Sequence, residues 1–388
     1  MTESGFFVNT LQNMEEAESA LSLSIEAFYP KGAPSELVDL WRYKWFEDPS
    51  FKLNNVFVVR DRNSNMIGGL RVVLRTLKRA DQVFRMFGIA ETFVAPNQQG
   101  KGLSSLLTQY AIQKGRQRSY DILVVVARKL IDYFYLKYGT YGLGAYNEVL
   151  LRGWHDTIKK VNEFRSTDIC LQDIDIINKA YEYSYFNCFG PMRRNSDHWK
   201  FLIEKISQQG RKSRTITRNG KGIGYFVTDE EEVVEISLLP GIPYRPVVDF
   251  LYCDIPIHRN SGELKLKIPH THRLLDDDLQ LDVTVRNREC YYGGHIVKIL
   301  NVKKALTLME ERLGYSLAAI TNKPIDLVEG NVKVRWNGKD AKASYSSDLD
   351  PSYQETLFLL GATSVYGQKD GWENTKSLPF VLCELDEF

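Results

Sequence analysis

The sequence predicts an α+β protein in which helices pack on sheets, and two observations support this prediction. In the first third of the chain, two amphipathic helices are followed by a hairpin, a long strand, a helix, a buried strand and a further helix. This order is typical of helices layered on one sheet. From about residue 155 a similar succession of helices, hairpin and strand starts again, which favours a duplicated fold.

Each element of the first third has its own pattern. Apolar residues recur at i, i+3, i+4, i+7 and i+8 from Leu103, which predicts one buried face of a helix. The continuous run Ile122–Ala127 is typical of a strand buried on both faces. The predicted elements are helices over 14–28 and 35–46, a hairpin of strands 56–60 and 70–74, a strand over 83–94, a helix from 103, a strand over 122–127 and a helix over 131–138.

The rest of the chain is predicted in the same way. In the repeat, Asn219-Gly220 turns a hairpin, and the strand after it ends at Pro240. Near the end, Asp350-Pro351 is typical of a helix N-cap and first helical residue. The predicted elements are helices over 174–185 and 196–206, strands over 215–217, 225–228, 233–239 and 295–300, a helix over 302–313, strands over 327–336 and 342–346, and a helix from 350 to about 360.

Length and composition indicate a globular protein of two or three domains. The chain has 388 residues, of which 43% are hydrophobic and 26% charged, and its net charge is +1. This balance argues against a nucleic-acid partner, because nucleic-acid-binding proteins concentrate positive charge. The sequence shows no secretory leader and no apolar run of about 20 residues. We therefore expect a cytoplasmic protein without a membrane partner.

Residues that commonly bind metals do not form a ligand pattern. The five cysteines are odd in number and none are spaced as CxxC, which indicates free thiols. His270-x-His272 lies in a predicted loop, where we expect surface positions, and the acidic run 276–278 is interpreted as a solvated turn or a helix cap. The isolated histidines are His155, His198 and His258. No metal cofactor is expected.

The turn over 99–104 is the strongest candidate for a binding site. It follows a strand and opens an amphipathic helix, so its backbone N–H groups and the helix dipole favour a pyrophosphate. Gly100 and Gly102 allow a phosphate to approach closely. A dinucleotide-binding turn is disfavoured because the third glycine of GxGxxG is missing, and a P-loop because Lys101 is not followed by Ser or Thr.

Two later segments look like this turn but lack its context. The glycine-rich segment 219–224 joins two predicted strands, which indicates a hairpin turn. The segment 241–246 follows Pro240, where the repeat would place its own phosphate turn. Pro243 and Pro246 remove N–H groups there, so the second repeat should not bind the donor.

The turn and a segment after it resemble the GCN5-related N-acetyltransferases (GNAT). Val94-Ala95-Pro96 with Gln99-x-x-Gly102-x-Ser104 is similar to their loop Arg/Gln-x-x-Gly-x-Gly/Ala, from which Ser104 departs mildly. The segment 134–139 resembles their Tyr-x-x-x-Gly segment. The resemblance implies acetyl-CoA as co-substrate. The residues expected to bind it are Phe93, Val94, Gln99, Gly100, Lys101, Gly102, Leu103 and Ser104.

The whole chain resembles the three-domain enhanced intracellular survival (Eis) family. Segments 192–199 and 294–302 are similar to that family's second domain and its entry to the third. The resemblance implies a catalytic GNAT domain over 1–152, a degenerate second GNAT domain over 153–288 and a sterol-carrier-protein-like domain over 289–388. It also implies a small polycationic acceptor, such as an aminoglycoside or a polyamine, and a homo-oligomer.

The resemblance also assigns catalytic roles. Tyr135 would protonate the departing thiolate, with Tyr141 as the second choice. The terminal carboxylate of Phe388 would accept a proton or attract the cationic acceptor, and a backbone N–H near Phe93 and Val94 would stabilise the oxyanion. Two alternatives stay open. One is acetylation of protein lysines or N-termini, and the other is a non-catalytic ligand-binding protein that uses its C-terminal domain.

Overall fold

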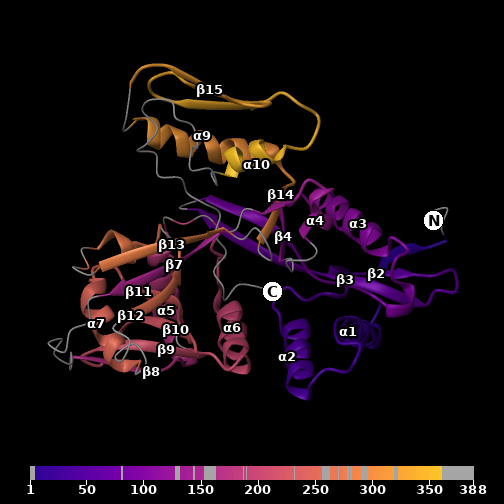
Figure 1. The fold of residues 1–388 in the computed structure, drawn as a ribbon, viewed down its shortest axis with the longest axis horizontal. Helices are drawn as coiled ribbons and strands as arrows, with labels where there is room; N and C mark the ends of the chain where they lie inside the picture. The colour runs from indigo at the N-terminus through magenta and orange to yellow at the C-terminus, as the bar shows by residue number, and fades with distance from the viewer. Residues whose placement is uncertain are drawn as a thin grey trace.

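The structure is a computed structural model, in which two large sheets with helices and a smaller third unit make up the chain (Figure 1). In the part that the structure describes, no helix is long and apolar enough to cross a membrane. The described residues are 5–79, 82–126, 132–142, 145–152, 163–186, 188, 190–230, 232–255, 263–269, 271–277, 279, 282–289, 295–318 and 322–360.

The first sheet has the strand order β1-β2-β3-β4-β5-β14-β6. β4 and β5 are parallel, whereas the other neighbouring strands run antiparallel. Its strands are β1 (Phe7–Thr10), β2 (Val56–Arg60), β3 (Met66–Arg79), β4 (Gln82–Val94), β5 (Ile122–Val126), β14 (His295–Ile299) and β6 (Tyr141–Gly142).

Helices cover both faces of this sheet because its strands are apolar on both sides. Phe57 and Leu123 face α3 (Leu103–Gln117) and the short α4 (Asp132–Leu136). Val56 and Phe93 face the opposite side, where α1 (Met14–Phe28) and α2 (Ser35–Phe46) pack. Alternate residues of β2 therefore serve two separate cores, as the period of a strand requires.

The second sheet repeats the order of the first. Read from β8, it runs β8-β9-β10-β11-β12-β7-β13, with β11 and β12 parallel. The predicted duplication of the fold is therefore confirmed by topology. Its elements are β8 (Phe164–Asp168), α5 (Ile174–Ser184), α6 (Ser196–Gln208), β9 (Lys212–Arg218), β10 (Lys221–Asp229), β11 (Glu232–Leu238), α7 (Tyr244–Asp254), β12 (Glu263–Ile268), β7 (Ala145–Arg152) and β13 (Asp282–Glu289).

The two halves exchange one strand each. β7, which follows the first half in the sequence, lies between β12 and β13 of the second sheet. β14, which follows the second half, lies between β5 and β6 of the first sheet. β7 therefore lies before the predicted boundary at 152/153 but belongs to the second sheet, and β14 lies after the boundary at 288/289 but belongs to the first. The predicted boundaries do not coincide with the limits of either sheet.

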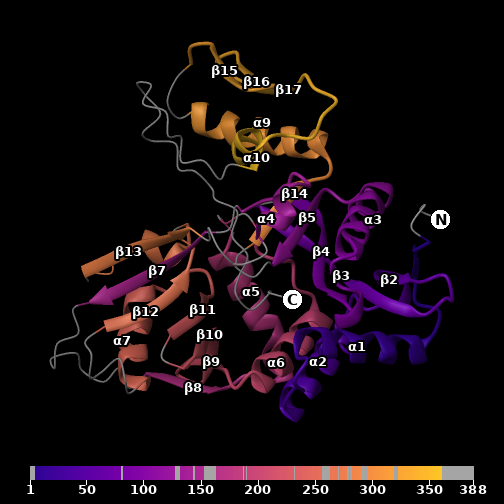
Figure 2. The same cartoon turned by 45° about the vertical axis from the view of Figure 1, so that its right-hand side comes forward.

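The third unit packs on the first sheet at the end away from α1 and α2 (Figure 1 and Figure 2). Apolar residues of α9 share a core with alternate residues of β4, β5 and β14, such as Met86 and Val124. Its elements are α9 (Val302–Ala318), β15 (Ile325–Glu329), β16 (Val332–Trp336), β17 (Ala341–Tyr345) and α10 (Tyr353–Leu360).

Two predictions for the third unit were wrong. The predicted strand 327–336 is two antiparallel strands, because the chain turns at Gly330, whose φ is 56°. The last helix is capped by Ser352 and not by Asp350. The Ser352 hydroxyl accepts from the Glu355 N–H, and the Glu355 carboxylate accepts from the Ser352 N–H at 2.7 Å, which is a capping box.

The predicted surface position of His272 was also wrong. Its side chain is fully buried, its Nδ1 accepts from the Leu274 N–H at 3.1 Å, and its Nε2 lies 3.0 Å from the Ile236 carbonyl oxygen. A sequence shows no partner of this kind, because Ile236 lies on a strand 36 residues away. In the described residues, no group of three or more His, Cys, Asp or Glu could hold a metal ion.

Burial of His272 predicts loss of stability in acid. Burial lowers the pKa of its imidazole from 6.5 to about 3, so the unfolded chain binds a proton that the folded chain does not. The contribution of the neutral, buried imidazole to the free energy of unfolding is fully present above pH 6.5. It is lost at about 1.4 kcal/mol per pH unit as the pH falls toward 3. We expect His272→Gln to flatten the fall of Tm between pH 7 and pH 5. An unchanged slope would contradict this assignment.

Candidate functional site

The parallel strands β4 and β5 separate at the end where the site lies. They pair from Met86 with Ile122 to Ile89 with Val125. Beyond Ile89, β4 continues to Val94 and stays paired with β3 on its other side. Among the described residues, the β5-facing edge of 90–94 has no strand partner. Its backbone groups are therefore available to pair with an extended ligand.

A bulge in β4 accompanies this separation. Leu70 of β3 pairs with Thr92 and Val72 pairs with Ile89, so two residues of β4 face the single residue Arg71. One of the two, Glu91, is buried and binds Arg71, with Nε to Oε2 at 2.6 Å and Nη2 to Oε1 at 3.2 Å.

This ion pair keeps Glu91 charged. Burial raises the pKa of the Glu91 carboxyl, but the Arg71 guanidinium outweighs burial, and the pKa lies below its ordinary value. Arg71 also donates to the Lys44 carbonyl oxygen at 3.1 Å, which ties β3 to α2. Glu91 is therefore occupied in holding the bulge and is not free to act as a base. No local pattern predicts this pair, because its partners are 20 residues apart.

The turn between β4 and α3 has the geometry of an anion site. Gly100 and Gly102 have φ values of 79° and 76°, which only glycine adopts without strain. A Cβ added at either position would meet nothing within 4 Å, so the turn is open on its outer side. Gly102 is the N-cap of α3 and provides no side chain to cap the first N–H groups. These N–H groups remain available to a phosphate.

The side chains of the turn are held close to it. Leu103 is buried against the core and anchors the start of α3. The Gln99 amide donates to the Val94 carbonyl oxygen at 3.4 Å, and Lys101 donates to the Gln98 side chain at 2.7 Å. These contacts bring the end of β4 and the turn together, as predicted for a single donor site.

A lysine that the sequence analysis missed also reaches this turn. Lys137 Nζ donates to the Ser105 Oγ at 3.0 Å, in the first turn of α3. Lys137 directly follows α4, which also carries Tyr135. The only signal in the sequence was its place two residues after that tyrosine, and a lysine at a helix end is too common to be selected on that ground.

Tyr135 lies in the core between α4, β4 and the start of α3. Its side chain is 3% exposed. Burial raises the pKa of its phenol, and the nearby Thr92 hydroxyl opposes part of the rise. Thr92 is on the open part of β4, and its buried Oγ1 has no hydrogen-bond partner among the described residues. Tyr135 is therefore a protonated phenol beside the edge at which the two strands separate.

The other two candidates are placed differently. Tyr141 lies on β6, and its ring contacts Tyr353 of the third unit at 5.4 Å between centroids. Phe388 lies outside the described residues.

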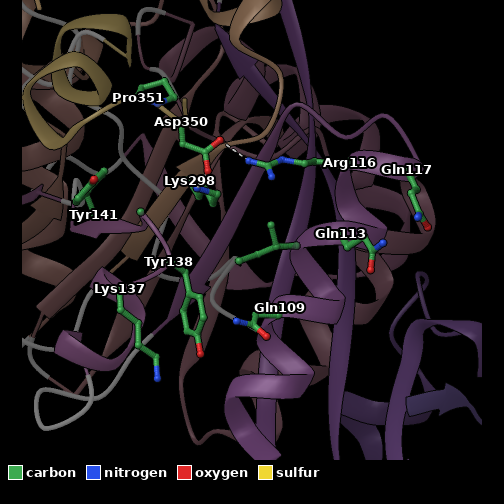
Figure 3. Close-up of a pocket in the computed structure, with 12 residues that line it drawn as sticks. Gln109, Gln113, Arg116, Gln117, Lys137, Tyr138, Tyr141, Lys298, Asp350 and Pro351 are labelled. Carbon is green, nitrogen blue, oxygen red and sulfur yellow. Dashed lines mark hydrogen bonds and ion pairs between the residues drawn. The ribbon is translucent and has the colours of Figure 1, made fainter. Parts of the chain in front are cut away.

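A cavity of about 550 Å³ opens between α3, the end of α4 and the third unit (Figure 3). In it, Lys298 Nζ donates to Asp350 Oδ2 at 2.7 Å, and Arg116 forms an ion pair with the same carboxylate. The lining residues are Gln109, Ile112, Gln113, Arg116, Gln117, Lys137, Tyr138, Gly139, Tyr141, Lys298, Asp350 and Pro351.

At the equivalent place in the second half, the N–H groups at the helix start are not available to a ligand. Gly241 has a φ of 80°, but Pro243 precedes α7 and Pro246 lies in its first turn. The Tyr244 N–H donates to Asp277 Oδ2 at 2.6 Å, so a carboxylate already occupies this helix start. The interpretation of 276–278 as a helix cap is confirmed for Asp277.

Comparisons with known proteins agree with this geometry. Residues 10–144 match the family described as "Acetyltransferase (GNAT) domain". The fold is similar to a GCN5-related N-acetyltransferase from Anabaena variabilis, with 17% identity, a TM-score of 0.61 and coverage of 92% of this chain and 90% of that chain. It is also similar to a GCN5-related N-acetyltransferase from Kribbella flavida, with 12% identity, a TM-score of 0.58 and coverage of 92% and 90%.

A further solved structure covers nearly the whole chain. Eis1 from Mycobacterium abscessus has 13% identity, a TM-score of 0.57 and coverage of 97% of both chains. At such identities the likeness shows the fold. Among curated protein sequences, no significant match is found.

Proposed function

Residues 10–144 form an acetyltransferase domain of the GNAT family, and from this premise we propose that the protein transfers an acetyl group from acetyl-CoA to an amine of a small polycationic acceptor. The protein is an acyltransferase, and enzymes of this family use acyl-CoA. The observation that carries the proposal is the open glycine turn, which meets the unpaired edge of β4 in the first half of the chain only.

The donor would bind along these two features. The pyrophosphate would accept hydrogen bonds from the N–H groups at the start of α3, with Lys137 beside it. The extended chain of the donor would pair with the backbone of 90–94 and bring the thioester toward Thr92 and Tyr135. The exposed turn leaves room for the phosphates, because nothing lies within 4 Å of a Cβ at Gly100 or Gly102.

The chemistry needs three proton or charge movements. The neutral amine attacks the thioester carbon, a C–N bond forms, and the resulting oxyanion is stabilised by a backbone N–H near Phe93 and Val94. The C–S bond then breaks, and Tyr135 donates its proton to the departing thiolate. The nitrogen loses its extra proton to the proposed base, the terminal carboxylate of Phe388, and a proton from solvent restores the Tyr135 phenol. A buried phenol suits this role, because burial keeps the phenol protonated at neutral pH.

The acidic helix α1 supports a cationic acceptor. It carries four glutamates and no basic residue, and it packs on the sheet face that includes Phe93. Glu16 and Glu18 pair with Arg60 and Arg42. Glu15 and Glu26 form no ion pair with other described residues, so their charge remains to attract a cation. The terminal carboxylate of Phe388 stays a proposed base or cation-binding group.

The domain roles are also proposals. We assign catalysis to the first half, a degenerate role to the second half, where Asp277 and two prolines fill the helix start, and a sterol-carrier-protein-like identity to the third unit. A homo-oligomer is proposed from the resemblance to the Eis family. The alternative acceptors are protein lysines and N-termini, and the alternative function is ligand binding by the third unit.

Calorimetry with acetyl-CoA tests the proposal. We expect saturable binding with one donor per chain, since among the described residues the turn before α3 leaves its first N–H groups uncapped, whereas Asp277 binds the N–H at the start of α7. No heat of binding at millimolar acetyl-CoA would contradict the enzyme assignment. A panel of polyamines, aminoglycosides and lysine peptides, with thiol release as the measurement, then separates the acceptor classes. Turnover of peptides alone would favour the alternative acceptor.

A further inference from the structure

The cavity between α3, the end of α4 and the third unit carries a surplus of positive charge. Its lining includes Arg116, Lys137 and Lys298 as cations and Asp350 as the one carboxylate among the described lining residues. Figure 3 shows Arg116 and Lys298 directed toward Asp350 from two different elements. Arg116 and Lys298 share the Asp350 carboxylate, whereas Lys137 donates to Ser105 Oγ, so the lining has three cations and one carboxylate.

Lys298 is a buried residue of the cavity wall. Its side chain is 2% exposed on β14, between β5 and β6, and burial lowers the pKa of its ammonium while Asp350 opposes that effect. A Cβ at Gly139 would meet its Nζ at 3.0 Å. Asp350, in contrast, is 45% exposed, so solvent and other anions can compete with it for the two cations.

The lining can also recognise a polar ring. Gln109, Gln113 and Gln117 lie four residues apart on one face of α3, and their amides line the cavity. The hydroxyl of Tyr138 is buried and has no hydrogen-bond partner among the described residues. Such amides and hydroxyls both donate and accept hydrogen bonds, as the edges of a nucleobase require.

One lining residue connects the cavity with the start of α3. Lys137, which lines it, donates to Ser105 in the first turn of α3. With a rise of 1.5 Å per residue, Gln109 lies about 6 Å and Arg116 about 17 Å along α3 from Ser105. A ligand held by phosphates at the turn could therefore extend its nucleoside end along this helix.

We propose that this cavity binds a phosphomonoester carried on an adenine nucleoside, with Arg116 and Lys298 around the phosphate and Lys137 on the side of the glycine turn. The nearest source is the 3′-phosphate of the acetyl-CoA donor, and in this respect the proposal rests on the proposed function. A phosphomonoester has a charge of about −1.5 to −2 at neutral pH, which matches the surplus. Asp350 then makes the third unit part of the donor site and competes with the phosphate for both cations.

Kinetics with acetyl-CoA and 3′-dephospho-acetyl-CoA test this proposal. We expect the unaltered enzyme to have a KM about tenfold higher for the dephospho donor, because it loses charged hydrogen bonds. Lys298→Met should raise the KM for acetyl-CoA about tenfold and leave the KM for the dephospho donor within about twofold. Asp350→Asn should lower the KM for acetyl-CoA alone. Equal KM values for the two donors in the unaltered enzyme would overturn the proposal.

Matched variants separate this effect from loss of folding. Arg116→Gln changes a side chain that is 43% exposed, so it tests the same charge if Lys298→Met does not fold. Lys114→Gln removes a charge from the same helix outside the cavity lining, where Lys114 lies over the Tyr110 ring, and should leave both KM values unchanged. An equal rise of both KM values in the Lys298 and Arg116 variants would overturn the proposal.

Adenosine 3′,5′-bisphosphate distinguishes the source of the phosphate. If this nucleotide competes with acetyl-CoA and Lys298→Met weakens the competition, the cavity belongs to the donor site. If calorimetry shows binding that Lys298→Met weakens, but the nucleotide does not compete with acetyl-CoA, the cavity binds a separate nucleotide. Binding insensitive to the substitution overturns the site. An enzyme that bound this nucleotide but turned over neither donor would contradict the proposed function and not the cavity assignment.

Discussion

Tyr135→Phe lowers kcat by about 10² to 10⁴-fold and leaves the affinity for acetyl-CoA nearly unchanged, as expected when a general acid is removed. In the proposed mechanism the phenol supplies a proton to the thiolate but does not hold the phosphates, which we place at the start of α3. The ring is 3% exposed, and phenylalanine preserves its packing against β4 and α3. Single-turnover thiol release and calorimetry measure the two quantities separately.

The pH dependence gives a second readout of the same variant. Burial raises the pKa of Tyr135 above its ordinary value of 10, so the phenol keeps its proton up to that pH and beyond. Its deprotonation should therefore not limit kcat below about pH 10. Tyr120→Phe removes a phenol in the same half, beside Arg85, and should leave kcat unchanged. If Tyr135→Phe retained the full rate, the tyrosine would have no part in proton transfer.

Gly102→Val weakens acetyl-CoA binding by about 100-fold or more. The added side chain enters the open space outside the turn, where we place the pyrophosphate, and no protein atom lies within 4 Å of its Cβ. Valine at a φ of 76° also costs about 1–2 kcal/mol in the left-handed region. The donor Kd from calorimetry and the Tm separate these two effects.

Gly241→Val is the matched control. Gly241 has a φ of 80° and also has nothing within 4 Å of an added Cβ, so the backbone strain is comparable. It precedes α7, whose first N–H groups already meet Asp277 and which includes Pro246. We expect a similar loss in Tm and an unchanged donor Kd. Equal weakening of the donor by both variants would refute the assignment of the donor to the first half.

Local patterns in the sequence predicted most elements of the two repeats. The helices α1 and α2 begin and end where their patterns predicted, because apolar periodicity and end signals act over a few residues. The elements β7, β8, α7, β12 and β13 were not predicted, and the burial of His272 depends on a distant strand. Two errors in the third unit were local. A turn at Gly330 divided one predicted strand, and Ser352 replaced Asp350 as N-cap because its capping box satisfies two N–H groups.

One part of the candidate site, the glycine turn, could be predicted because its residues are neighbours in the chain. The glycine turn can be read from the sequence because strand, turn and helix start are contiguous, and its open geometry agrees with the prediction. The role of Tyr135 came from the family resemblance, and the structure adds its burial beside Thr92. Phe388 remains a prediction.

What the sequence determined by itself is the glycine turn before α3 and the duplicated order of elements, since both depend on neighbouring residues. Only the tertiary structure decided the exchange of β7 and β14, the buried pair of Arg71 with Glu91, and the cavity where Lys298 meets Asp350. Each of these joins residues that are distant in the chain. Pairing between distant strands and burial of opposite charges depend on how the whole chain packs, and no local pattern records that packing.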